Sequence, residues 1–293
     1  MNYNPNSLAV NPQFSNIQPF RSRVLAVVSG KGGVGKTNVA VNLGLSLARR
    51  GLRVALLDAD LGTANVDVVL GVNPRYHLQH VVTGQKSLAD IIVEGPFGLQ
   101  IIPGASGLPD LADLPEAQRQ MLLHALMVLD GSVDLLIIDT GAGVGQSVVQ
   151  FILAAGEMLV VTTPEPTSIT DAYALMKVVA GYQMPVSTKL VVNNVQNRSE
   201  GEATGRKLAA VAHQFLGRQV EVLGVIPSDK SVRDAVYMQS PLLQSRPYSP
   251  AARAINQLGE QLWAGNSKEK TVTSVGKFLR QMLSLKIMTV AVI

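Results

Sequence analysis

The sequence predicts an α/β fold of three layers, in which a mostly parallel central sheet is flanked by helices. From Arg23 onward, short apolar segments alternate with segments of helical spacing, the pattern of a parallel sheet covered on both faces. The chain has 293 residues, and 47% of them are hydrophobic, enough for one large α/β domain. The last part of the chain predicts one further element, an amphipathic helix.

The elements follow from the spacing of apolar residues and from the positions of helix stop signals. The first strand is expected at Val24–Val28, and the helix after it at Asn38–Arg50, where Gly51 ends it. Further strands are expected at Arg53–Leu57, Leu99–Ile102, Leu135–Ile138, Met158–Thr162, Lys189–Asn193 and Val220–Ile226. Further helices are expected at Glu116–Leu129, Ser168–Val179, Arg206–Leu216 and Ser249–Trp263.

Composition divides the chain into four parts. Residues 1–21 are almost uncharged and rich in Asn, Pro, Ser and Gln, which predicts a disordered leader. Residues 22–264 form the α/β domain, and residues 265–271 form a polar linker. Residues 272–293 hold the amphipathic helix.

Several classes of protein are excluded or disfavoured by composition. The absence of cysteine excludes disulfides and thiol catalysis. The net charge of +4 permits contact with nucleic acid or anionic lipid but argues for neither. Since no apolar run reaches about 18 residues and no signal peptide is visible, we expect a cytoplasmic protein.

A glycine-rich loop joins the first strand to the first helix. Gly30 to Thr37 reads Gly-Lys-Gly-Gly-Val-Gly-Lys-Thr and fits the phosphate-binding pattern G-x-x-x-x-G-K-[ST]. Backbone N–H groups of such a loop surround phosphate oxygens, Lys36 reaches the β- and γ-phosphates, and Thr37 holds Mg²⁺. The sequence therefore predicts a P-loop NTPase fold with a triphosphate bound by Gly30, Lys31, Gly32, Gly33, Val34, Gly35, Lys36, Thr37 and Asn38.

Acidic residues follow two of the predicted strands. Asp58 and Asp60 end the second strand, where ligands of open α/β sheets bind, and a carboxylate there can orient water or contact Mg²⁺ through its water shell. Asp139 ends an apolar strand in the form of a Walker B element and is expected to hold Mg²⁺ with Thr37. The alternatives are a helix N-cap for Asp58 or Asp60 and a structural turn at Asp139.

Residues at the ends of the later strands indicate which nucleotide base is bound. The Asn/Thr-Lys-x-Asp element of guanine-binding proteins is missing, and Asn193-Asn194 stands where it would be expected. An Asn amide can both donate to and accept from the edge of adenine, and Asp229, after Pro227-Ser228, is a second candidate for the base pocket. We therefore favour ATP over GTP.

Together these residues resemble the MinD/ParA-type ATPases, whose deviant Walker A loop reads K-G-G-x-G-K-[ST], over about residues 22–240. The resemblance implies an ATP-bridged homodimer in which Lys31 reaches the nucleotide phosphates of the partner. It also implies that Asp60 positions the hydrolytic water and that Asn194 and Pro227, Ser228 and Asp229 line the adenine. The implied catalytic residues are Lys31, Lys36, Asp60 and Asp139, and the implied Mg²⁺ residues are Thr37, Asp58 and Asp139.

Two stretches, Asp58 to Asp67 and Glu165 to Ala174, look most like the FlhG/FleN branch of this family, the regulators of flagellar number and placement. That resemblance implies three partners: the GTPase FlhF, flagellar switch-complex proteins and a flagellar transcription regulator. Three features depart from the branch. Thr63 stands in place of Leu, Thr140-Gly141 stands in place of Thr-Ala, and the leader lacks the D-Q-A-x-x-L-R motif that stimulates FlhF in some relatives.

The C-terminal segment has the spacing of an amphipathic helix. Its apolar residues recur on one face, with Lys277 and Arg280 on the other; the apolar set is Val275, Phe278, Leu279, Met282 and Leu283. Such a helix can lie in an anionic membrane surface as a weak, reversible anchor that two copies on a dimer strengthen. The alternative is docking on its own domain or on a partner, and the two states can alternate with the bound nucleotide.

The sequence thus predicts a slow ATPase that works as a dimerisation switch, regulates flagellar number and placement, and associates reversibly with the inner face of the cell membrane. The alternatives are a MinD-like division-site regulator, a ParA-like DNA-partition ATPase and a module that holds ATP without turnover. Lys and Arg form no dense cluster in the sequence, so we do not expect direct DNA binding. Asp60 and Asp139 argue against a module without turnover.

Overall fold

One eight-stranded sheet organises the protein. The computed structural model describes residues 22–60, 65–104, 114–264 and 273–285. The strand order is β3-β4-β2-β5-β1-β6-β7-β8, and all neighbouring strands are parallel except β3 and β4. The strands are β1 (Arg23–Ser29), β2 (Val54–Ala59), β3 (Val93–Glu94), β4 (Gln100–Ile102), β5 (Leu135–Ala142), β6 (Glu157–Thr162), β7 (Ser187–Val195) and β8 (Val220–Pro227).

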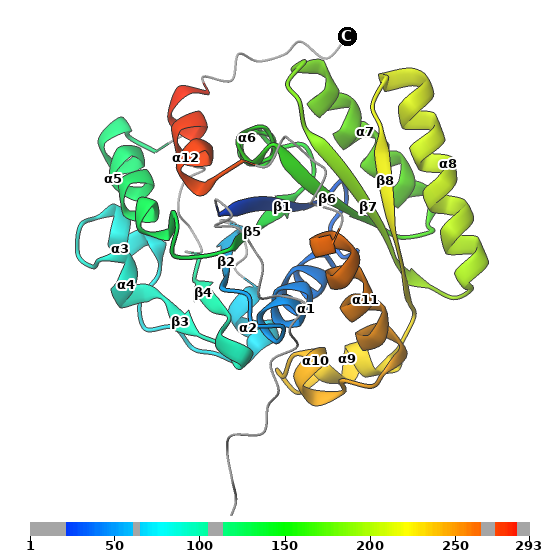
Figure 1. The fold of residues 1–293 in the computed structure, drawn as a ribbon, viewed down its shortest axis with the longest axis horizontal. Coiled ribbons are helices and arrows are strands. Elements are labelled where there is room, and N and C mark those ends of the chain that lie inside the picture. Colours follow the sequence, from blue (N-terminus) through cyan, green and yellow to red (C-terminus); the bar gives the residue numbers. More distant parts are fainter. Residues whose placement is uncertain (1–21, 61–64, 105–113, 265–272, 286–293) are drawn as a thin grey trace, which may run out of the picture.

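Helices cover both faces of the sheet (Figure 1). One layer holds α3 (Leu78–Val82), α4 (Leu88–Ile91), α5 (Glu116–Leu126), α6 (Gln146–Ala155), α7 (Pro166–Gly181), α8 (Arg198–Leu216) and α12 (Val275–Ser284). The other layer holds α1 (Lys36–Ala48), α2 (Val66–Leu70), α9 (Lys230–Tyr237), α10 (Leu242–Ser245) and α11 (Pro250–Ala264). Two short 3₁₀ segments, η2 (Pro96–Gly98) and η3 (Met127–Leu129), complete the described elements.

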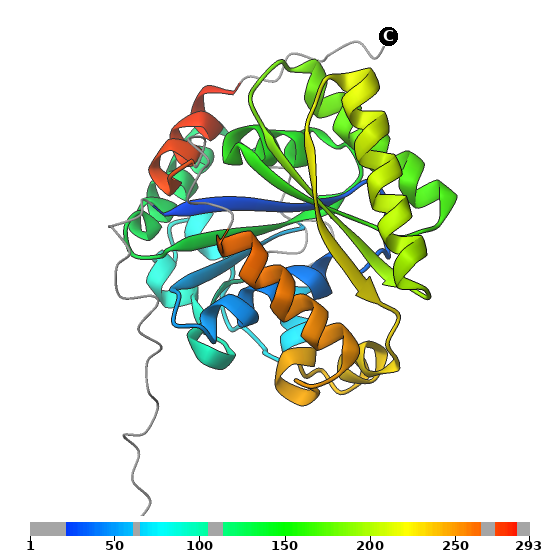
Figure 2. The ribbon, with the colours of Figure 1, turned by 45° about the vertical axis from the view of Figure 1, so that its right-hand side comes forward.

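The central strands are apolar throughout because both of their faces are buried. In β1, Val24, Ala26 and Val28 face the core beneath α5 to α8, whereas Leu25 and Val27 face the core beneath α1 and α11. Figure 2 shows α8 and α11 on opposite faces of the edge strand β8. The predicted three-layer fold is confirmed.

Several boundaries differ from the predicted ones. Helices α2, α3, α4, α6, α9 and α10 and the two-residue strand β3 were not predicted, and α8 begins at Arg198, eight residues before the predicted start. Two glycines in this first part of α8 weaken its helical pattern, but packing requires them. A Cβ at Gly201 would lie 2.6 Å from Val195 Cγ1, and a Cβ at Gly205 would lie 2.8 Å from Val222 Cγ1. The backbone of α8 at these glycines therefore packs directly against valine side chains of the sheet.

The C-terminal helix α12 is docked on the domain. Val275, Phe278, Leu279 and Met282 are buried against α5 and α6, and Phe278 stacks on Phe151 with ring centroids 6.5 Å apart. This packing corrects the expectation of a free apolar face, since the helix occupies the docked alternative. Leu283, the fifth member of the predicted face, lies at its edge and is 40% exposed.

Lys277 and Arg280 face away from the domain on the exposed side of α12. Within the described ranges, no helix combines the length and apolarity needed to cross a bilayer. The predicted leader (residues 1–21) and linker (residues 265–271) lie outside the described residues.

Candidate nucleotide-binding site

The glycine-rich loop leads from β1 directly into α1, with Gly35 at the helix N-cap in the left-handed conformation (φ 88°). Only glycine adopts this conformation without strain, and a Cβ here would also lie 2.5 Å from Asn193 Nδ2. The first N–H groups of α1 have no partner within the helix and point toward the loop. The loop and the helix N-terminus together form an anion site of the kind that binds phosphate.

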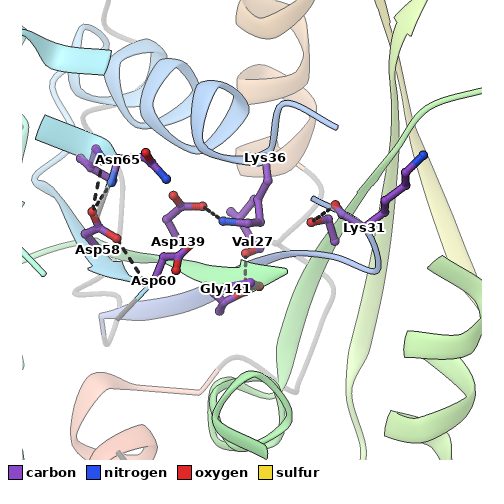
Figure 3. Close-up of polar contacts among 11 residues, drawn as sticks. Val27, Lys31, Lys36, Asp58, Asp60, Asn65, Asp139 and Gly141 are labelled. Carbon is purple, nitrogen blue, oxygen red and sulfur yellow. Dashed lines mark hydrogen bonds and ion pairs between the residues drawn. The ribbon is translucent and has the colours of Figure 1, made fainter. Parts of the chain in front are cut away.

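A buried ion pair lies beneath this loop. Lys36 Nζ is 2.7 Å from Asp139 Oδ1, and both side chains are almost fully buried (Figure 3). The two residues meet because β1 and β5 are neighbours, with Val27 in register with Asp139. Burial raises the pKa of Asp139, and the charge of Lys36 opposes that rise. The structure thus brings together the predicted phosphate lysine and the predicted Mg²⁺ carboxylate.

Thr37 also hydrogen-bonds Asp139 through its side chain. A hydroxyl and a carboxylate are ligands that Mg²⁺ accepts, and Mg²⁺ usually keeps several waters and contacts substrate phosphates. Across the described part of the chain, no three His, Cys, Asp or Glu side chains are grouped closely enough for a protein-only metal site. A Mg²⁺ ion here would therefore depend on phosphate oxygens.

Asp58 lies beside Asp139 on the adjacent strand β2, where the two residues are in register. Its carboxylate accepts backbone N–H groups from Asp60, Asn65 and Val66 at 3.1–3.2 Å, so it holds the N-terminus of α2 (Figure 3). Burial and the nearby charge of Asp139 raise the pKa of Asp58 to about 7. Asp58 is nevertheless not an N-cap residue, because it lies within β2 and Asn65 is the N-cap of α2, and its role toward Mg²⁺ stays a prediction.

Asp60 lies at the same edge of the sheet, next to the last residues of β5. Its Oδ1 is 3.9 Å from the position that a Cβ would take at Gly141. The charge of Asp60 contributes to the raised pKa of Asp139. Asp58, Asp60 and Asp139 therefore lie at the same edge of the sheet and interact electrostatically, without forming a group close enough to hold a metal by themselves.

The two lysines of the loop point in different directions. Lys31 extends away from the Lys36–Asp139 pair (Figure 3). Its Nζ lies 3.1 Å from Glu165 Oε2 and 3.0 Å from Thr167 Oγ1, at the start of α7, and its side chain is 40% exposed. Lys36 belongs to the buried centre, whereas Lys31 lies at the surface of the site.

A cleft of about 310 Å³ extends from the loop toward the ends of β7 and β8. Of the predicted base residues, Asn194, Pro227 and Asp229 line it, and Ser228 is not among the lining residues. Asn194 has a positive φ of 57°, a conformation that asparagine tolerates better than most residues. Asn193, Thr163 and Val232 also line the cleft.

Asn193, Thr163 and Val232 were not identified from the sequence as residues of the cleft. Asn193 donates its amide to the carbonyl of Val34 at 2.8 Å and so holds the glycine-rich loop in place. The Asn193-Asn194 pair at a strand end was the signal that could have identified it. Thr163 and Val232 gave no such signal, because each stands in an ordinary apolar or helical pattern.

Asp229 holds two helices at the far end of the cleft. Its Oδ1 accepts the N–H of Ser231 at 2.8 Å, which caps α9, and its Oδ2 accepts the N–H of Ala251 at 3.0 Å, at the start of α11. Burial alone would raise the pKa of Asp229, but these hydrogen bonds outweigh burial and lower it. Asp229 therefore lines the cleft while its carboxylate is engaged in holding the fold.

Comparison with known proteins agrees with this geometry. Residues 25–242 match the family model described as the CobQ/CobB/MinD/ParA nucleotide binding domain, and the chain belongs to this family. It is an ATPase of the P-loop class whose cofactors are ATP and Mg²⁺. The site has the chemistry that both ATP and Mg²⁺ need. The loop and the N-terminal N–H groups of α1 suit the phosphates, and the oxygen atoms beside the buried Lys36–Asp139 pair suit Mg²⁺.

Among individual relatives, the chain is 43% identical to the antiactivator FleN of Pseudomonas aeruginosa, over 85% of this chain and 89% of FleN. It is 35% identical to the flagellum site-determining protein YlxH of Helicobacter pylori, over 81% of this chain and 80% of YlxH. The septum site-determining protein MinD of Pyrococcus horikoshii, solved with Mg-ADP, superposes with a TM-score of 0.68 at 28% identity, over 85% and 99% of the two chains. The predicted resemblance to the MinD/ParA family and its FlhG/FleN branch is confirmed.

The role of Asp229 predicts a pH-dependent stability difference. Asp229→Ala should lower the free energy of unfolding by about 1–2 kcal/mol at pH 7, because two backbone N–H groups lose their acceptor. Since the folded-state pKa of Asp229 is depressed, this contribution is present above the unfolded pKa of about 3.9 and is lost as pH falls through the lower folded value. Urea unfolding between pH 3 and 8 measures the difference.

The matched control is Asp234→Ala in the same helix, which should change stability by less than about 0.5 kcal/mol. A loss for Asp229→Ala that stays equally large at pH 3 would contradict the assigned role of the carboxylate.

Proposed function

We propose that this chain is an ATP-dependent dimerisation switch that regulates flagellar number and placement. The carrying observation is the orientation of Lys31, which extends away from its own phosphate centre at the exposed rim of the cleft. The similarity to FleN and YlxH supports the flagellar role. The product of the switch is therefore an assembly state, and hydrolysis resets it.

Within one subunit, Lys36 can pair with either of two anionic groups, the Asp139 carboxylate or the nucleotide phosphates. In the present structure it neutralises buried Asp139; with nucleotide bound it would contact the phosphates, and Asp139 and Thr37 would hold Mg²⁺. Mg²⁺ supplies charge neutralisation at the phosphates. Asp60, beside Gly141, positions the attacking water. Hydrolysis is slow in the monomer because this arrangement is completed only in the dimer.

Lys31 is the residue that we assign to the partner's nucleotide. Its ion pair with Glu165 is exposed on both sides, and exposed pairs contribute only about 0–1 kcal/mol. Lys31 can therefore leave Glu165 and Thr167 for a phosphate of the second subunit at little cost. A charged hydrogen bond to phosphate, shielded from water between two subunits, is stronger than the contact that it replaces.

The helix α12 is the proposed output of the switch. It lies on α6, whose first residue Gln146 follows the short loop Gly143–Gly145 at the end of β5, the strand that holds Asp139, so movement of that loop on ATP binding reaches α12 through α6. Gln281 Oε1 on α12 is buried without a hydrogen-bond partner. Release of α12 would hydrate this atom and free the apolar face of the helix for an anionic membrane surface.

The proposed location is accordingly the cytoplasm, with reversible peripheral association with the inner face of the membrane. The proposed partners are the GTPase FlhF, flagellar switch-complex proteins and a flagellar transcription regulator. A second candidate function is a MinD-like division-site regulator, which the 32% identity to MinD of Bacillus subtilis favours. A partition role has weaker support, because the likeness to a ParA-family ATPase at 22% identity concerns the fold alone.

The role of Lys31 is tested by the variant Lys31→Ala. The variant should bind ATP about as well as the wild type but stay monomeric with Mg²⁺ and ATP, because it loses the proposed contact across the dimer and, within its own subunit, only an exposed ion pair with Glu165 and a hydrogen bond to Thr167. Size-exclusion chromatography with light scattering measures the mass of both proteins.

The comparison variant is Asp60→Ala, which keeps Lys31 and should form ATP dimers that release phosphate much more slowly. Unaltered dimers of Lys31→Ala would refute the contact across the dimer, and undiminished phosphate release by Asp60→Ala would remove Asp60 from the mechanism.

The role of α12 is tested by sedimentation with vesicles of phosphatidylglycerol and phosphatidylethanolamine in the presence of Mg²⁺ and ATP. A chain truncated after Trp263 should dimerise but no longer sediment with the vesicles. A matched double variant, Lys277→Glu with Arg280→Glu, keeps the docked face and should bind at least about tenfold more weakly, since each cation contributes about 1 kcal/mol near an anionic surface. If the truncated chain sediments like the full chain, another region is the anchor.

The cellular role is tested by counting flagella in cells that lack the chain. Their number or placement should change, the wild-type gene should restore both, and the Lys31→Ala gene should not. Normal flagella together with misplaced septa would favour the MinD-like alternative instead.

A further inference from the structure

A buried hydroxyl faces the nucleotide cleft without a partner. Thr163, directly after β6, is only 6% exposed, and it lines the cleft together with the glycine-rich loop and Asn194. Its Oγ1 is one of three buried side-chain polar atoms in the described part of the chain that have no hydrogen-bond partner. Buried polar groups are normally paired, so an orphan hydroxyl in a cleft points to a ligand.

The surroundings of Thr163 are otherwise fully engaged. Its backbone N–H donates to Ser168 Oγ at 3.1 Å, and its carbonyl accepts from Thr162 Oγ1 at 3.4 Å. The Thr162 and Ser168 hydroxyls lie 2.9 Å apart and hydrogen-bond each other. This network fixes the end of β6 to the start of α7. The backbone of Thr163 is therefore held in a defined position on the wall of the cleft.

The strand order indicates which part of a nucleotide meets this hydroxyl. The glycine-rich loop follows β1, Asn194 belongs to β7 and Pro227 to β8, while β6 lies between β1 and β7 (Figure 1). Adjacent strands are about 4.8 Å apart, so Thr163 lies about one strand spacing from the phosphate loop and one from the base side. In any nucleotide the sugar stands between the phosphates and the base.

We propose that Thr163 Oγ1 hydrogen-bonds a ribose hydroxyl of the bound adenine nucleotide, an inference that rests on the nucleotide site assigned above. A threonine hydroxyl and a ribose hydroxyl can each donate and accept, so the two groups match. The phosphates are provided for by the N–H groups of the loop and by Lys36, which leaves the neutral hydroxyl of Thr163 for the neutral sugar. Thr163 thereby gives the site a preference for ribonucleotides over deoxynucleotides.

Calorimetric titration of the full chain with ADP and with 2′,3′-dideoxy-ADP, both with Mg²⁺, tests the inference; ADP is used so that dimerisation does not contribute. The wild type should bind ADP about fivefold more tightly than the dideoxy compound, as expected for one hydrogen bond. The side chain of Thr163→Val has nearly the same shape. This variant should bind ADP about fivefold more weakly than the wild type does, and it should bind dideoxy-ADP as tightly as the wild type does. Thr163→Ser should keep the wild-type preference.

The matched control is Thr170→Val, whose exposed hydroxyl bonds only the Pro166 carbonyl and should leave both affinities unchanged. Unchanged ADP affinity in Thr163→Val would overturn the inference, and so would an equal loss for ADP and dideoxy-ADP, which would place the hydroxyl on a phosphate or in the fold. A wild-type chain that binds dideoxy-ADP as tightly as ADP would also overturn it while leaving the nucleotide site standing. A wild-type chain that binds neither compound would overturn the nucleotide site itself and this inference with it.

Discussion

The ion pair between Lys36 and Asp139 is the interaction on which the site depends. Both charges are buried, and a buried charge that loses its partner destabilises a protein by about 3–5 kcal/mol. The pair exists because the first turn of α1 faces the end of β5, next to β1 in the sheet. It keeps the phosphate lysine and the proposed Mg²⁺ carboxylate in place, and incoming phosphates are the group that can separate them.

Two structural connections lead away from this pair. On one side, Asp58 lies in register with Asp139 and holds the N-terminus of α2, so the electrostatics of the centre extend to that helix. On the other side, β5 continues from Asp139 to Ala142 and leads through a short loop into α6, on which α12 is docked through Phe151 and Phe278. Loss of the contact between Asp139 and Lys36 can therefore affect both the acidic edge of the sheet and the packing of the C-terminal helix.

Much of this could be predicted from the sequence because local patterns carry it. The glycine-rich loop, Asp139 and the parallel sheet each have a spacing that few other structures share. The features that escaped prediction depend on contacts between distant segments. Asp229 accepts a hydrogen bond from the N–H of Ala251, and Asn193 donates one to the carbonyl of Val34. The glycines of α8 weaken its helical pattern in the sequence, although close packing on the sheet requires them. The apolar face of α12 fits a membrane or a groove equally well by pattern, and only the packing of Phe278 shows which one it occupies here.

The most direct test of the Lys36–Asp139 centre is the stabilisation that Mg²⁺ and ATP give to the wild type and to the variant Lys36→Met, measured as the shift in the urea midpoint of unfolding. A ligand that binds only the folded state stabilises it by about 2.7 kcal/mol at a hundred times its dissociation constant. We predict that Mg²⁺ and ATP raise the urea midpoint of the wild type by an amount that corresponds to a free energy of that size. At the same ATP concentration the midpoint of Lys36→Met should not change. An equal shift in both proteins would contradict the central role of Lys36 in nucleotide binding.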